Sequence, residues 1–250
     1  MEKYILINKC IFFLKKGILV MGDLHIGYDY MIQKSGVLFP ERQIDGMIIE
    51  LDEIFKIIKE KKYILKKIIF LGDIKHSFGF EYREKNYLNK IFQFLKKHIE
   101  EKNIIFIKGN HDTFNYSPRD KLRNYYINDE LAFTHGDKFF KSVFNKKIKT
   151  IVIGHIHPSI IISDKQNIRR EKFKCFLKGK YKNKNIIILP SFLSSAEGMT
   201  INKFKEDYED SFSIIPKKTL SNFEVYVIGK KDIFDFGKLK KLSTSSVASV

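Results

Sequence analysis

Short, uninterrupted hydrophobic runs separated by glycine or polar turns are the main pattern of this chain. Segments such as "YILI", "GILVM" and "KIIFL" place apolar residues at consecutive positions instead of alternate ones. This pattern is typical of strands buried on both faces, because neither side of such a strand meets water. It predicts strands at 4–7, 11–14, 17–23, 67–73, 103–110, 131–137, 150–155, 159–163, 185–190 and 224–229, the first two forming a hairpin.

Helical periodicity fills the gaps between the early strands. Pro40 suits the first turn of a helix, and the apolar residues after it predict an amphipathic helix over 40–60. A second helix is expected around 88–95. Strand–helix–strand order predicts an α/β fold with parallel pairing, whereas the closer spacing of the later strands predicts antiparallel or mixed sheet.

No linker clearly divides the chain, so we expect a single domain over 1–240. Residues 28–39 are expected to form a loop near the strand ends. The lysine-rich segment 163–184 is expected to be a basic insertion, and the small, polar residues 241–250 a flexible tail.

The formal net charge of +17 favours a polyanionic partner such as nucleic acid. Abundant Ile, Lys and Asn are equally typical of an AT-biased genome, which raises lysine content without any function, so both explanations stay open. No apolar run approaches the roughly 20 residues of a membrane-spanning helix, and two cysteines make no disulfide framework. We therefore expect a cytoplasmic protein that does not bind membranes.

Side chains that can bind metals follow the predicted strands. Six of the seven histidines lie at or just beyond a carboxyl end of a strand, which is where ligands gather in open α/β sheets. The candidate site residues are these six histidines and the neighbouring acids and amide: Asp23, His25, Asp73, His76, Asn110, His111, Asp112, His135, His155 and His157.

The spacing and chemistry of these residues indicate a metal centre. In "DLH" (23–25) and "HIH" (155–157) two donors are two positions apart, and on an extended segment such side chains share a face. Carboxylate, amide and imidazole donors without thiolates suit Mn²⁺, Fe²⁺, Zn²⁺ or Ni²⁺. The donors are too many for one ion, and Asp73 could bridge two ions about 3.5–4 Å apart.

The order of these motifs along the chain resembles that of the calcineurin-like metallophosphoesterases. The motifs are "GDLH" (22–25), "GD" (72–73), "GNHD" (109–112), "HGD" (135–137) and "GHIH" (154–157). The resemblance implies a four-layer αββα sandwich of two mixed β-sheets flanked by helices, with two divalent ions, most often Mn²⁺, at the strand ends.

The same resemblance implies a role for each motif residue. One ion would be held by Asp23, His25, Asp73 and His157, and the other by Asp73, Asn110, His135 and His155. Beside the scissile phosphate, His111 would act with Asp112 as its orienting partner. A hydroxide that bridges the two ions would be the nucleophile.

The histidine at position 76 follows the "GD" acid by three residues, where many family members have Asp. Double-strand-break nucleases of the Mre11 and SbcD type are similar here, and their first motif continues to Gly-Tyr as in "DLHIGY" (23–28). DNA-ligase-associated phosphoesterases and their archaeal relatives read close to "GDIKH" (72–76). This likeness implies that His76 contacts a phosphodiester substrate, and the alternative is a surface loop residue.

Three functions are compatible with these motifs. The first is a metal-dependent phosphodiesterase or nuclease acting on DNA or RNA, and the second is a phosphohydrolase of nucleotides, cyclic nucleotides or phosphomonoesters. The third is a scaffold that retains the fold without catalysis. Within the basic segment, Arg169 and Arg170 could track a phosphate backbone while Phe173, Phe176 and Tyr181 stack on bases. The alternative is a solvated hairpin whose aromatic residues face the core.

Overall fold

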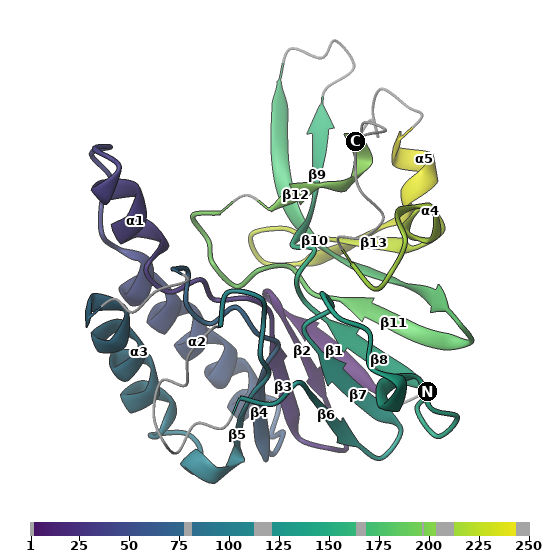
Figure 1. Cartoon of the computed structure of the whole chain (residues 1–250), viewed down its shortest axis with the longest axis horizontal. Coiled ribbons are helices and arrows are strands. Elements are labelled where there is room, and N and C mark those ends of the chain that lie inside the picture. Colours follow the sequence, from purple (N-terminus) through teal and green to yellow (C-terminus); the bar gives the residue numbers. More distant parts are fainter. Residues whose placement is uncertain are drawn as a thin grey trace.

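A computed structural model describes residues 3–77, 82–112, 122–163, 169–196, 198–203 and 213–243 of the chain. Two mixed β-sheets pack face to face, with helices on the outer face of each (Figure 1). The predicted four-layer sandwich is therefore confirmed. Of the expected tail at 241–250, the residues after position 243 lie outside the described part of the chain.

The five-stranded sheet holds the amino-terminal part of the chain. Its order is β1 (Tyr4–Ile7), β2 (Cys10–Phe13), β3 (Ile18–Met21), β4 (Lys67–Phe70) and β5 (Ile104–Phe106). The first three strands are antiparallel, whereas β3, β4 and β5 are parallel. Because these three strands run in the same direction, their carboxyl ends meet at one edge of the sheet.

The second sheet is built from nine strands. In chain order they are β6 (Tyr125–Asn128), β7 (Leu131–Thr134), β8 (Thr150–Ile153), β9 (Pro158–Ser163), β10 (Arg170–Tyr181), β11 (Lys184–Ile188), β12 (Met199–Thr200), β13 (Glu224–Ile228) and β14 (Ile233–Lys238). β7, β8 and β11 are parallel neighbours. β10 is antiparallel to β9, β11 and β13.

Alternation along the strands creates the layers. In β2, Cys10 and Phe12 face α2 (Gln43–Glu60) and α3 (Tyr82–Leu95), whereas Ile11 and Phe13 face the second sheet. The far face of the second sheet is covered by short helices. These are η2 (Lys141–Phe144), η3 (Ile201–Lys203), α4 (Lys217–Leu220) and α5 (Leu239–Ser243).

Three local expectations need correction. The long helix begins at Gln43 rather than at position 40, because the backbone of Arg42 (φ −117°, ψ 4°) is not helical. Residues 28–39 include a helix, α1 (Tyr28–Lys34). The segment 163–184 contains β10, which pairs with three strands and so forms part of the sheet itself.

The remaining described elements are short. They include η1 (Glu101–Asn103), which leads into β5. No helix in the described ranges has both the length and the apolar character needed to cross a membrane.

Close packing between β10 and the following elements gives a test of the fold. A Cβ atom at Gly179 would lie 2.2 Å from the ring of the buried Phe223. We expect Gly179→Ala to lower the free energy of unfolding by about 1–3 kcal/mol, because overpacking a core displaces its neighbours. The measurement is urea unfolding followed by circular dichroism.

The matched control is Gly46→Ala on the exposed side of α2. An added Cβ at Gly46 meets nothing within 4 Å, so the better helix propensity of Ala should raise stability by about 0.5–1 kcal/mol. Equal effects of the two substitutions would contradict this account of the packing.

Candidate metal centre

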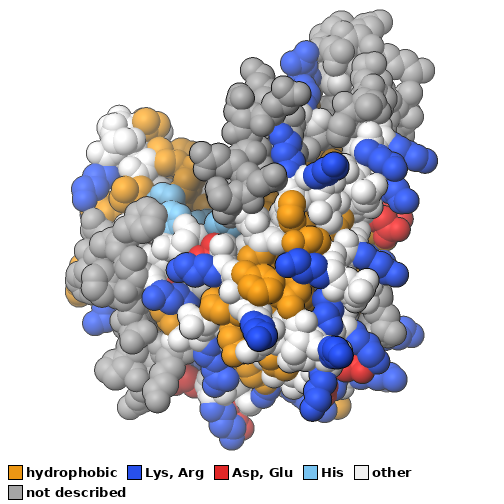
Figure 2. All heavy atoms as spheres, turned by 45° about the vertical axis from the view of Figure 1, so that its right-hand side comes forward, with side chains coloured by type: hydrophobic (Ala, Val, Ile, Leu, Met, Phe, Trp, Pro, Cys, Tyr) orange, Lys and Arg blue, Asp and Glu red, His pale blue; other side chains and the backbone are white. Residues whose placement is uncertain are grey.

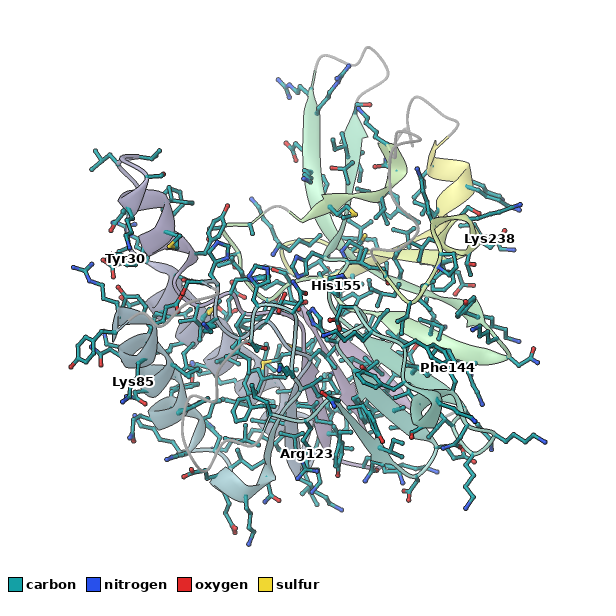
Figure 3. The ribbon with its side chains drawn as sticks, viewed as in Figure 1. Tyr30, Lys85, Arg123, Phe144, His155 and Lys238 are labelled. Carbon is teal, nitrogen blue, oxygen red and sulfur yellow. The ribbon has the colours of Figure 1, made fainter. Side chains whose placement is uncertain are left out.

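The carboxyl ends of strands from both sheets meet at one place. Asp23 follows β3 and Asp73 follows β4, whereas His135 and His155 follow β7 and β8 of the other sheet. Hydrogen bonds join the two sheets here, since the His155 amide donates to Asp23 Oδ2 at 3.0 Å. His135 Nδ1 likewise donates to the carbonyl of Leu71 at 2.9 Å. His155 lies at this junction in Figure 3.

Three donor atoms lie around the Nε2 atom of His135. It lies 2.9 Å from Asn110 Oδ1, 3.0 Å from His155 Nδ1 and 3.4 Å from Asp73 Oδ2. In the neutral ring, Nδ1 of His135 carries the hydrogen that bonds the Leu71 carbonyl. The lone pair of Nε2 then faces the other three donors. These are the four side chains expected at one ion.

A second group of donors surrounds Asp23. His157 Nε2 lies 3.0 Å from Asp23 Oδ2, and His25 Nε2 lies 4.0 Å from Asp73 Oδ2. Two donors that each lie about 2.1 Å from one ion, at a right angle to each other, are about 3 Å apart. The spacing of the Asp23 and His157 atoms therefore fits a shared cation.

Several buried donors near Asp23 lack the partners that buried polar atoms normally have. His25 Nδ1 forms no hydrogen bond with any residue that the structure describes, and the contacts of Asp23 Oδ1 (3.1 Å to His135 Nδ1) and His157 Nε2 (3.0 Å to Asp23 Oδ2) are ion pairs without hydrogen-bond geometry. A buried polar atom without a partner costs free energy. All three belong to the residues expected at the first ion, and a bound cation would satisfy such atoms.

The backbone is strained at the predicted ligands. Nine non-glycine residues in the described ranges have positive φ, and four of them are predicted ligands. They are His25 (44°), Asp73 (44°), His155 (64°) and His157 (47°). Left-handed conformations cost free energy in such residues and persist where surrounding contacts enforce them, commonly at functional sites.

Glycines leave room for the two carboxylates. A Cβ at Gly109 would lie 2.2 Å from Asp73 Oδ1, and one at Gly154 would lie 2.7 Å from Asp23 Oδ2. Any larger residue at these positions would push a carboxylate out of the cluster. The glycines of "GNHD" and "GHIH" are therefore required by the close approach of the acids.

The electrostatics differ between the imidazoles: burial acts to lower the pKa of His135, but the carboxylates of Asp23 and Asp73 outweigh burial and raise that pKa well above its ordinary value. Burial lowers the pKa of His25 to about 3, which keeps its ring neutral and able to bind a metal. Burial acts to raise the pKa of Asp23, but His157 and His135 outweigh burial and hold that pKa well below its ordinary value. Two almost completely buried carboxylates, Asp23 and Asp73, thus bring negative charge that a divalent cation would balance.

Beside the predicted ligands lie His76 and His111. The two rings are stacked with centroids 5.8 Å apart, and His111 Nδ1 lies 2.8 Å from the His76 carbonyl. Both rings pack edge-on against His25, at 5.5 and 5.2 Å. The structure thus places His76, which is half-buried, inside the cluster rather than on a surface loop. Figure 2 shows histidine side chains at the floor of a hollow.

The carboxylate of Asp112 supports the backbone of this site. It accepts hydrogen bonds from the amides of Ile74 at 3.1 Å and Gly109 at 2.9 Å. These bonds link the segment after β4 to the segment after β5. The expected role of Asp112 as the partner of the His111 ring remains a prediction.

One supporting residue, Gln43, was not identified from the sequence. Its side-chain amide donates to the carbonyls of Leu24 (3.2 Å) and His25 (2.8 Å), and its Oε1 accepts from the Gly27 amide at 2.9 Å. These bonds hold the strained loop that carries His25. A glutamine at the start of a helix has no distinctive spacing, so only the folded loop reveals this role.

The buried Lys9 and the half-buried Lys174, also not singled out in the sequence, hold the segment that packs behind Asp23. Lys9 Nζ donates to the Phe192 carbonyl and to Ser194 Oγ, both at 2.6 Å. Lys174 Nζ donates to the Ser191 carbonyl at 2.9 Å, and burial lowers the pKa of Lys174 to about 7. The amide of Phe192 in turn donates to the Asp23 carbonyl at 2.8 Å.

The basic segment lies farther from the cluster. Arg170 pairs with Ser163 at the outer end of β9, four residues beyond Ser159. At about 3.3 Å per residue this is about 13 Å along the strand. Arg169 and Arg170 are exposed there, whereas Phe176 is buried in the core between the sheets and is not available to stack on bases.

Comparison with known proteins agrees with this geometry. The family model described as calcineurin-like phosphoesterase matches residues 17–192. The chain belongs to the calcineurin-like phosphoesterase family. Members of this family bind divalent metals, so the chain is a metal-dependent phosphoesterase whose cluster supplies candidate ligands.

One solved structure supports the fold of this calcineurin-like phosphoesterase. A nuclease MPE of Pseudomonas putida is similar with a TM-score of 0.58 and 18% identity, covering 93% of this chain and 100% of that one. A conserved uncharacterized protein of Streptococcus pneumoniae, a predicted phosphoesterase, gives a TM-score of 0.29 and 14% identity. It covers 87% of this chain and 96% of the other. No curated protein matches the chain.

The hydrogen bonds from Gln43 to the loop that carries His25 give a testable prediction. Gln43→Glu keeps the shape of the side chain but replaces its amide donors by a carboxylate that faces two carbonyl oxygens. We expect the affinity for Mn²⁺ to fall about 10- to 100-fold, as for other residues that orient metal ligands. Isothermal titration calorimetry measures this affinity.

The matched control is Gln93→Glu, which makes the same substitution on the exposed surface of α3. It should bind Mn²⁺ like the wild type. A folded Gln43→Glu protein with wild-type Mn²⁺ affinity would refute the role given to this side chain.

Proposed function

We propose that this phosphoesterase hydrolyses phosphodiester bonds in nucleic acid and that it uses two divalent ions, of which Mn²⁺ suits the donors best. Asp23, His25, Asp73 and His157 would hold one ion, and Asp73, Asn110, His135 and His155 the other. Oxygen and imidazole donors without thiolates favour Mn²⁺ over structural zinc.

The position of Asp73 between the two donor groups carries this proposal. Its Oδ1 accepts the His111 amide at 2.8 Å. Its Oδ2 lies 3.4 Å from His135 Nε2 on one side and 4.0 Å from His25 Nε2 on the other. A carboxylate that faces both groups is suited to bridge a pair of cations.

Bound divalent ions would neutralise the phosphate, clamp its oxygens and lower the pKa of a bound water. The protein's own contribution is positioning and proton transfer. His111 Nε2 lies 4.0 Å from Asp73 Oδ2, and the His111 side chain is 21% exposed. Nδ1–H of His111 donates to the His76 carbonyl, so the protonated imidazolium form of the ring would carry a second hydrogen on Nε2 and could donate that proton to the leaving oxygen.

Nucleic acid is the substrate class that best fits the charge. The chain carries a formal net charge of +17, which attracts polyanions. The Pseudomonas putida protein of similar length and fold is a nuclease. Arg169 and Arg170, at the outer end of the β9–β10 pair, would contact the backbone away from the metal centre.

The test compares two histidine substitutions. We expect His111→Gln to lower kcat at least about 100-fold, because it removes a proton donor, while the protein still binds two Mn²⁺ ions. His98→Gln, which changes the one histidine outside the cluster, should retain full activity. Substrates are bis(p-nitrophenyl) phosphate, p-nitrophenyl phosphate, DNA, RNA and cyclic nucleotides, with bound metal measured by mass spectrometry.

The substrates separate the alternatives. Turnover of nucleic acid that falls steeply with salt supports the proposal, since a protein that binds phosphate backbones releases counterions. Turnover confined to monoesters or free nucleotides would favour a small-molecule phosphohydrolase instead. Loss of both ions in His111→Gln would contradict the role assigned to this histidine.

A further inference from the structure

The projection formed by α1 and the turn after it ends in exposed apolar side chains. Val37 is 53% exposed and Leu38 is completely exposed. α1 begins three residues after His25, and the ring of Tyr28 at its base lies 5.1 Å from the ring of His76. In Figure 1 α1 stands clear of the sandwich, and Figure 2 shows hydrophobic side chains beside the histidines.

Hydrogen bonds hold this tip in one shape. Gln33 Nε2 donates to the Phe39 carbonyl at 2.6 Å, which closes the turn. The amide of Gly36, which has a φ of 88°, donates to the Gln33 carbonyl at 2.9 Å. Val37 and Leu38 are therefore presented to solvent by a built turn, although burying them would stabilise the protein.

The base of the projection is fastened to the metal centre. The buried Asp29 accepts hydrogen bonds from Ser195 Oγ at 3.0 Å and from the Arg42 amide at 3.3 Å. Ser195 belongs to the same segment as Phe192, which bonds Asp23. The tip consequently has a defined position relative to the predicted ligands.

We propose that the tip residues Val37 and Leu38 contact nucleobases of the substrate strand beside the phosphodiester at the metal centre. This inference rests on the proposed action on nucleic acid. Bases have apolar faces, and apolar side chains inserted against them separate stacked bases. The exposed Lys34 and Arg42 flank the tip with positive charge, which suits a polyanion better than an uncharged protein surface.

The length of α1 sets which base would be reached. Seven residues at about 1.5 Å each place the end of α1, next to the tip, about 10 Å from its start at Tyr28. A stacked strand advances about 3.4 Å per nucleotide, so the tip would meet a base about three nucleotides from the phosphate at the ions. A dinucleotide would be too short to reach the tip.

The test uses the double variant Val37→Ser, Leu38→Ser with the full chain and Mn²⁺. We expect kcat/KM to fall about tenfold for a single strand of about ten nucleotides, because a contact between a side chain and a base is worth this much. The values for a dinucleotide and for bis(p-nitrophenyl) phosphate should not change. The control Ile64→Ser alters a side chain that is 69% exposed at the amino end of β4, away from the metal centre.

The other outcomes overturn the inference in distinguishable ways. An unchanged kcat/KM for the long strand, or equal losses on all three substrates, would show that the tip does not contact bases. A loss that accompanies dissociation of a dimer in sedimentation velocity would show that the tip binds a second copy of the chain. If the wild type hydrolyses bis(p-nitrophenyl) phosphate but no oligonucleotide, the proposed action on nucleic acid fails together with this inference, whereas cleavage of the long strand with an unchanged kcat/KM in the double variant overturns this inference alone. If it hydrolyses no phosphoester, the proposed function itself fails.

Discussion

Two buried acids, Asp23 and Asp73, hold together the segments that follow the strands at the edge where the two sheets meet. Asp23 accepts the amide of His155 from the opposite sheet, and Asp73 accepts the amides of Leu24 and His25 at its carbonyl and that of His111 at its side chain. The two acids thereby fix the segments that carry the histidines. Their burial also creates the concentration of negative charge that a pair of cations would balance.

The positive φ angles and the glycines follow from this constraint. Three histidines and one acid take left-handed conformations so that their side chains face a common centre. Gly109 and Gly154 leave space for the carboxylates. Gln43 then offsets part of the local strain with a hydrogen bond to the His25 carbonyl, whereas Lys9 and Lys174 hold the carbonyls of Phe192 and Ser191 in the neighbouring segment. Such local strain is maintained only where its surroundings enforce it.

The sequence was sufficient to predict the central buried strands, because these leave a local signal, but not β6, β12 or β14. Consecutive apolar residues indicate strands buried on two faces, as in β3 and β4, and metal-binding residues after those strands indicate the cluster. The parts that could not be predicted depend on distant partners. Gln43 acts through the loop of His25, and Lys174 through a segment 17 residues away. β10 looked like an insertion because its outer half is charged, and only its pairing with three strands shows that it belongs to the sheet.

The central claim is that Asp73 bridges two divalent ions. Anomalous X-ray diffraction from crystals grown with Mn²⁺ tests it most directly. The account predicts two anomalous peaks about 3.5–4 Å apart, one between Asp73 and the Asp23, His25 and His157 side chains and one between Asp73 and the Asn110, His135 and His155 side chains. A single peak, or peaks that do not contact Asp73, would contradict it.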